Sequence, residues 1–173
     1  MAAWTRGDAL HLAAHAVAAW ANGVTGGEFE GKPVAPANVR RSCAVARGFW
    51  AAAAKDGLPA AIVAAAGNAL SNVPDMPPGA ECADNLDTDS VEAVASQLFP
   101  RLSKADPGAD PGVPGAHHPR LQMGISNLAS AALTAKRNAV KRVADSIEAS
   151  WKESGAWIWD SAATSALVHM TPG

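Results

Sequence analysis

The segment DALHLAAH, residues 8–15, holds the side chains in this sequence that are best suited to chemistry. Asp8, His11 and His15 stand three and four residues apart, a spacing that brings them close together along an α-helix. Two histidines at positions i and i+4 can share one Zn²⁺, Ni²⁺ or Cu²⁺ ion, and a carboxylate one turn earlier can add a third ligand. The segment lacks the glutamate of the HExxH motif. It is therefore a candidate metal site without the general base of a metalloprotease.

A helix over residues 8–22 has to position these side chains. Thr5 and Asp8 match a capping box at its start, and the glycines that follow residue 22 end it. On a helical wheel the apolar side chains share one side, whereas Asp8 and the two histidines lie on the other. The pattern therefore predicts a solvated polar face. The alternative is a metal site that recruits a further ligand, for which the sequence offers His117, His118 and His169.

Basic residues gather at the start of the next expected helix, over residues 38–56. Arg40 and Arg41 fall in its first turn, where positive charge opposes the helix dipole, and Arg47 lies on the same polar side. This arrangement indicates either a solvated face or contact with an acidic partner or phosphate. The basic segment at residues 136–142 is followed by acidic residues one turn later, as on an exposed helix face.

Three tryptophans, Trp151, Trp157 and Trp159, crowd around Gly155 near the end of the sequence. On a helix, Trp157 and Trp159 would point about 160° apart, so one bundle core could not easily bury both. Either the segment is not helical there, or an indole contacts another protein, as tryptophan does at interface hot spots. The three tryptophans therefore join Arg40, Arg41 and Arg47 as candidate partner-binding residues.

Helix signals recur along the chain and predict an all-α, Ala-rich bundle of five or six helices in a single domain. The remaining helices are expected over residues 59–72, 90–99, 125–154 and 156–170. Positions 125, 129, 132, 136, 140, 143, 147 and 151, apolar except for Lys136, repeat with an eleven-residue pattern that keeps them on one side of a nearly straight helix. Residues 23–37 are expected to form a loop or short hairpin. Residues 73–88 and 100–120, rich in Pro, Gly and Asp, are expected as linkers or arms.

Composition limits the classes of protein that the chain can belong to. A net charge of −2 over 173 residues gives no general attraction to nucleic acid or anionic membrane. The 41 alanines favour helix but bury little area, so the six tryptophans have to fill the core. Cys43 and Cys82 lack metal-site spacing and are expected as two buried thiols, with a single disulfide between them as the alternative. No segment is apolar enough to span a membrane, and Asp8 interrupts the only signal-like stretch.

These features favour a non-enzymatic structural or assembly subunit that acts through protein–protein contacts, as a homo-oligomer or within a larger assembly. A component of a bacterial or phage particle would suit the thin core and the long arm, and the expected location is the cytoplasm or an assembled particle. The alternatives are a helical protein that holds Zn²⁺ or another divalent transition metal at Asp8, His11 and His15, and a small nucleic-acid-binding protein. No catalytic residue is predicted, because the chain has neither a nucleophile elbow nor a phosphate-binding glycine loop. No cofactor is expected apart from that metal.

Overall fold

The computed structural model describes residues 5–25, 30–31, 57–77 and 119–172, and these adopt an all-α fold. Its helices are α1 (Arg6–Ala21), α3 (Leu58–Ala69), the short 3₁₀ helix η2 (Leu70–Asn72), α5 (Pro119–Ala135), α6 (Arg137–Ser154) and α7 (Ser161–His169). The two-residue strands β1 (Glu30–Gly31) and β2 (Trp157–Ile158) pair antiparallel. The helices expected over residues 38–56 and 90–99 lie outside the described residues, as do Cys43, Cys82 and residues 100–118.

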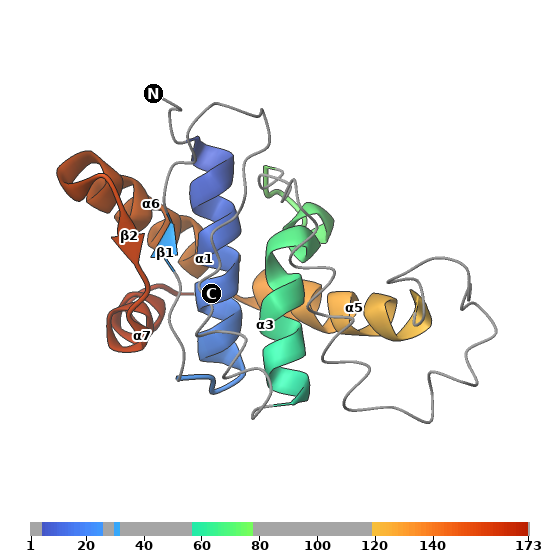
Figure 1. The fold of residues 1–173 in the computed structure, drawn as a ribbon. Coiled ribbons are helices and arrows are strands. Elements are labelled where there is room, and N and C mark those ends of the chain that lie inside the picture. The colour runs from blue at the N-terminus through green and yellow to red at the C-terminus, as the bar shows by residue number, and fades with distance from the viewer. Residues whose placement is uncertain (1–4, 26–29, 32–56, 78–118, 173) are drawn as a thin grey trace.

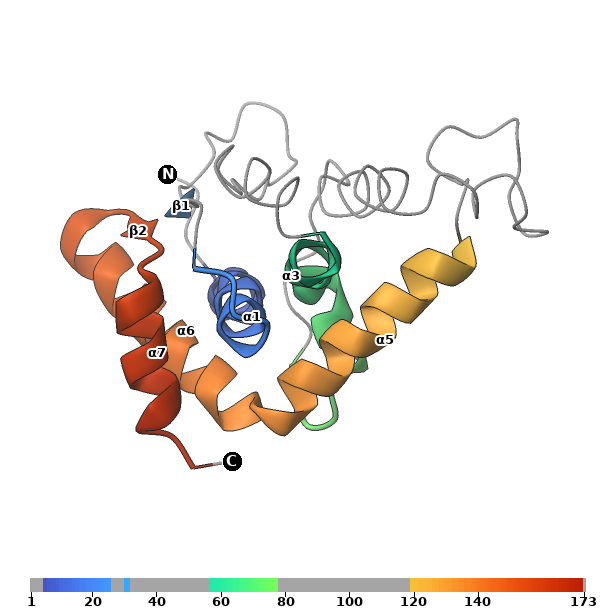
Figure 2. The ribbon, with the colours of Figure 1, turned by 90° about the horizontal axis from the view of Figure 1, so that it is seen from below.

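Helix α1 is the centre of the fold. Figure 1 shows it beside α3, and Figure 2 shows it nearly end-on, with α3 on one side, α6 and α7 on the other, and the junction of α5 and α6 beneath it. Every side chain from Ala9 to Ala19 is buried as a result. The segment can be buried on all sides because alanines dominate it and no charged residue interrupts it.

The expectation of a solvated polar face on α1 is therefore wrong. His11 and His15 are 1% and 2% exposed, so both imidazoles lie in the core. The helical wheel compares the hydrophobicity of the two sides of the helix, but it does not show that neighbouring helices cover both sides. The stretch between Ala9 and Ala19 has no polar side chains except the two histidines, which is the pattern of a fully enclosed helix.

The ends of α1 follow the expected local signals. The Thr5 hydroxyl accepts a hydrogen bond from the Asp8 backbone N–H, and the Asp8 carboxylate accepts one from the Thr5 backbone N–H, so the capping box is confirmed. Arg6 in the first turn reaches α6, where its guanidinium pairs with Asp145 at 2.8 Å and Glu148 at 3.1 Å. Those two carboxylates therefore join α1 to α6. The sequence pattern had indicated that they would pair with basic residues of α6 itself.

The long helix expected after residue 125 is two helices. The chain breaks at Lys136, whose φ of −126° and ψ of 27° lie outside the helical range. The apolar stripe itself is buried on both sides of the break, at Ile125, Ala129, Val140, Val143, Ile147 and Trp151. The two halves pack on different partners, since α5 lies mainly against α3 and α6 mainly against α1. A straight helix could not follow both, and Lys136 instead places its ammonium over the Trp20 ring.

The segment around Trp157 and Trp159 is extended, not helical. Gly155 ends α6 with a left-handed φ of 77°, as expected, but α7 starts only at Ser161, where the Asp160 carboxylate caps it. In an extended chain, alternate side chains point to the same side. Trp157 and Trp159 are therefore both buried, at 8% and 7% exposure, while Ile158 between them is 68% exposed. Trp151 is buried as well, so these three indoles pack in the core of their own chain.

Among the helices that the structure describes, none combines the length and the apolar character needed to cross a lipid bilayer.

Candidate functional site

The two histidines of α1 form a buried pair that faces α3. Their Nε2 atoms lie 3.1 Å apart, and their rings meet edge to face with centroids 4.9 Å apart. The Nδ1 atom of His15 lies 2.7 Å from the backbone carbonyl oxygen of Val63 in α3. One turn of α1 and the facing turn of α3 thus build this site, which we call the His pair.

The hydrogen-bond geometry fixes the protons of the His pair when both rings are neutral. A carbonyl oxygen only accepts, so Nδ1 of His15 must carry the proton that it donates to Val63. The Nε2 atom of His15 is then an acceptor, and Nε2 of His11 must donate to it. The pair therefore forms a directed chain of hydrogen bonds from His11 through His15 to the backbone of α3.

We expect this chain to be visible in the tautomers of the two rings. Long-range ¹H–¹⁵N correlation spectra of the metal-free protein should show His11 protonated at Nε2 and His15 protonated at Nδ1. Exposed His169 in the same sample serves as the reference for a ring that exchanges with solvent. Finding the two core rings in one and the same tautomer would contradict the assigned direction of the hydrogen bonds.

Gly67 of α3 is the residue that admits the His pair, and the sequence analysis missed it. A Cβ atom at this position would lie 2.2 Å from Cε1 of His11, 2.4 Å from its Nε2, and 2.7 Å from Nε2 of His15. These separations are far below van der Waals contact, so no larger residue fits without moving the rings. The signal in the sequence was a single glycine among the alanines of α3, where it costs helix stability unless packing requires it.

Asp8 is not part of the His pair. Its carboxylate is held at the start of α1, where it accepts hydrogen bonds from the backbone N–H and the hydroxyl of Thr5 at 2.8 and 2.6 Å. His169 lies edge-on against Trp20 near the other end of α1. In the part of the chain that the structure describes, no three His, Cys, Asp or Glu side chains converge as metal ligands. His117, His118, Arg40, Arg41 and Arg47 lie outside that part.

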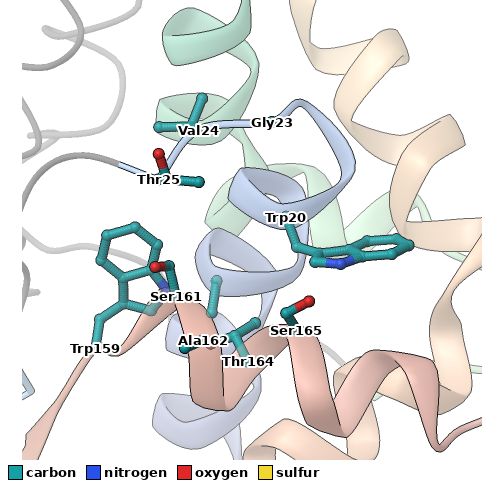
Figure 3. Close-up of a pocket in the computed structure, with 10 residues that line it drawn as sticks. Trp20, Gly23, Val24, Thr25, Trp159, Ser161, Ala162, Thr164 and Ser165 are labelled. Atoms are coloured by element: carbon teal, nitrogen blue, oxygen red, sulfur yellow. The ribbon is translucent and has the colours of Figure 1, made fainter.

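A cavity of about 220 Å³ lies between the C-terminal end of α1 and the start of α7 (Figure 3). Trp20 and Trp159 lie on opposite sides of it, and small side chains of α7 stand between them. The lining residues carry indoles, methyl groups and hydroxyls and include no ionisable side chain. The hydroxyl of Thr164 is already committed, since it donates to the Asp160 carbonyl at 2.8 Å. The lining therefore includes no general acid or base and no base that could activate its serine and threonine hydroxyls.

No family model, curated protein or solved structure matches the chain.

Helix α5 exposes a face without charge, which we call the α5 face. The face consists of six exposed residues, Met123, Gly124, Asn127, Leu128, Ala131 and Ala135. Met123 and Leu128 are large apolar side chains that are 64% and 49% exposed. No residue from 121 to 135 is ionisable, whereas the next helix, α6, exposes ionised side chains such as Arg142 and Lys152. The contrast marks the α5 face as a surface suited to contact with protein, since charged residues are depleted at the core of interfaces.

Proposed function

We propose that the chain is a non-enzymatic assembly subunit that pairs with a second copy of itself through the α5 face. The observation that carries this proposal is the exposure of Met123 and Leu128 on the part of α5, residues 121–135, that has no charged side chain. Single exposed apolar residues are common on monomeric proteins. A whole exposed helix face without charge is instead typical of a surface that contacts another molecule. The cavity and the His pair, in contrast, offer no arrangement of catalytic groups among the described residues.

A second copy is the partner that the chemistry of this face fits best. In a two-fold arrangement the same surface meets itself, so any charge on it would oppose an equal charge. The α5 face avoids that penalty because it has none. Met123 lies near one end of the face and Ala131 and Ala135 near the other. When two antiparallel copies cross at Asn127, Met123 of one copy lies over the position of Ala131 in the other, so a large side chain meets a small one.

The face runs along α5, whose N-terminal end projects away from the centre of the fold and whose main neighbour is α3 (Figure 2). One helix face buries less area than the roughly 800 Å² per partner of a standard stable interface. The pairing that we propose is therefore reversible and depends on concentration. The tryptophans do not support it, because they are buried in their own chain.

A charge at the centre of the α5 face should prevent this pairing. We expect the wild-type mass in light scattering to rise from 17.6 kDa toward twice that value as concentration increases. Leu128→Glu lies next to the proposed two-fold axis, where the new carboxylates of the two copies would oppose each other, and it should weaken association about tenfold or more. Ala149→Glu, on the exposed face of α6, is the matched control and should associate like the wild type.

The proposal fails if the wild-type chain remains a monomer at every concentration, or if Leu128→Glu and Ala149→Glu associate equally well. Circular dichroism of the three proteins provides the check on folding. Both substituted positions are exposed on helices, so neither substitution should reduce the helix content.

A further inference from the structure

We infer that His11 and His15 are the protein ligands of one divalent transition-metal ion, which they bind through their Nε2 atoms. This inference stands apart from the proposed pairing, because it concerns the core between α1 and α3 and not the α5 face. Three features of the His pair carry it: the separation of the two Nε2 atoms, the hydrogen bond that holds His15, and the absence of a side chain at Gly67.

The separation of the two nitrogen atoms is that of two ligands on one ion. At a Zn–N distance of about 2.05 Å, two nitrogens at a tetrahedral angle lie roughly 3.3 Å apart. The same bond length at a right angle, as in tetragonal Cu²⁺ or Ni²⁺ sites, gives about 2.9 Å. The observed distance of 3.1 Å lies between the two values. The pair can therefore accept an ion with small movements of the two rings.

His15 is already oriented as a metal-bound histidine is. Metal-binding histidines usually donate their second ring N–H to a carboxylate, a backbone carbonyl or a water, which fixes the tautomer and aims the free lone pair at the ion. The bond from Nδ1 of His15 to the Val63 carbonyl has this role, with a length of 2.7 Å. The remaining lone pair, on Nε2, points at the neighbouring histidine.

Gly67 leaves the coordinating edges of both rings free of a covering side chain. Its missing Cβ would come within 2.7 Å of each Nε2 atom, so any other residue would occupy the space beside the two ligands. Alanine at this position would stabilise helix α3, so the glycine lowers the stability of the helix. The need for space beside the two rings explains why a glycine is present. The two ligand atoms and the glycine come from facing turns of α1 and α3, so the site exists only when these helices are packed together.

Two neutral imidazoles leave the double charge of the ion uncompensated in a buried site. No carboxylate among the described residues joins them, since Asp8 is held at the N-terminus of α1. The ion that we propose therefore keeps exchangeable ligands, such as water, hydroxide or a small anion, at its other positions.

Binding at this site has a proton signature that distinguishes it from binding at a surface histidine. In the metal-free pair the proton of His11 sits on Nε2, which donates to His15. An ion can take that lone pair only if the proton moves to Nδ1 of the same ring. His15 keeps its proton on Nδ1 throughout. One metal ion bound thus changes the tautomer of His11 and leaves that of His15 unchanged, and the two histidines themselves release no net proton.

The test is a titration of the full-length, metal-free protein with Zn²⁺, followed by equilibrium dialysis and ¹H–¹⁵N spectra of the histidine rings. We expect one bound Zn²⁺ per chain, the change of tautomer at His11 alone, and a rise in Tm of about 5 °C or more at a hundredfold excess over Kd. His11→Gln should abolish this binding, because it removes one ligand. His169→Gln, which alters an exposed histidine on α7, should bind as the wild type does.

The inference is overturned if roughly 1 mM Zn²⁺ leaves the ring nitrogens of His11 and His15 unchanged in the wild-type protein, a measurement that requires no substitution. Zn²⁺ that shifts only other histidines, or that binds His11→Gln as tightly as the wild type, overturns it too. The light-scattering mass measured with and without Zn²⁺ keeps this result separate from the proposed pairing.

Discussion

Replacing Gly67 by alanine should destabilise the protein by about 2 kcal/mol, although alanine is the better helix former. On an exposed helix the substitution would be favourable by about 0.8–1.0 kcal/mol. Here the new methyl group would lie 2.2 to 2.7 Å from three atoms of two imidazole rings. Overpacking of this kind costs about 1–3 kcal/mol and occasionally more, so the steric cost exceeds the helix gain.

The rings cannot simply turn away from the new methyl group. His15 is held by its bond to the Val63 carbonyl, and both rings are buried on every side. A displaced ring would lose a hydrogen bond in the core, where an unpaired polar group costs about 1–3 kcal/mol. Relaxation therefore replaces one penalty by another. Urea unfolding, monitored by circular dichroism, measures the change in the free energy of unfolding.

Gly124→Ala is the matched control for this measurement. Gly124 also lies inside a helix, but a Cβ there would meet no atom within 4 Å. We expect that substitution to raise the free energy of unfolding by about 0.5–1 kcal/mol, measured at protein concentrations below any self-association. If Gly67→Ala stabilises the protein as Gly124→Ala does, the packing of α3 against the His pair is not as described.

The parts of the fold that the sequence predicted are those set by local interactions. The start of α1 follows from the Thr5 and Asp8 capping box, and the end of α6 from the left-handed conformation of Gly155. Each of these signals involves residues a few positions apart, so a sequence read alone contains the whole interaction. The burial of most of the stripe from Ile125 to Trp151 was equally predictable, because its period matches that of a helix.

The errors share a different cause, because each involved a partner distant in the sequence. The break at Lys136 occurs where the chain changes from packing on α3 to packing on α1, and the apolar pattern continues through it. The tryptophans at 157 and 159 are buried together because β2 is extended and pairs with β1, more than a hundred residues earlier. A helical wheel contains no information about either event.

The candidate site was half predictable for the same reason. The spacing of His11 and His15 puts them next to each other on any helix, and the structure does place their Nε2 atoms in contact. Asp8 has the spacing of a third ligand, but its carboxylate accepts a hydrogen bond from the Thr5 backbone N–H in the capping box. Val63 and Gly67, which complete the site, belong to another helix, and only the packing of α1 on α3 reveals them.

A double-mutant cycle between His11 and Gly67 should show that the cost of a side chain at position 67 depends on the His11 ring. His11→Ala alone removes the ring whose Cε1 and Nε2 atoms make the two closest approaches to the position of the missing Cβ. It also leaves a cavity and deprives His15 of a hydrogen-bond donor, so we expect a loss of about 2–4 kcal/mol.

In the His11→Ala background, Gly67→Ala should change sign and stabilise the protein by about 1 kcal/mol. The methyl group then enters space that the imidazole has vacated, and His15 can shift to make room, so the gain in helix propensity remains while the steric cost disappears. The coupling free energy between the two positions is the difference between this effect and the loss expected in the wild type, about 3 kcal/mol.

Four urea unfolding curves supply the cycle, and His11→Asn provides a second background if His11→Ala is too unstable to measure. Sites without contact couple by no more than about 0.5 kcal/mol. A coupling of that size or smaller would mean that the cost of Gly67→Ala arises elsewhere in α3. A coupling near 3 kcal/mol, in contrast, would locate the cost at the point where the two imidazoles meet the bare backbone of α3.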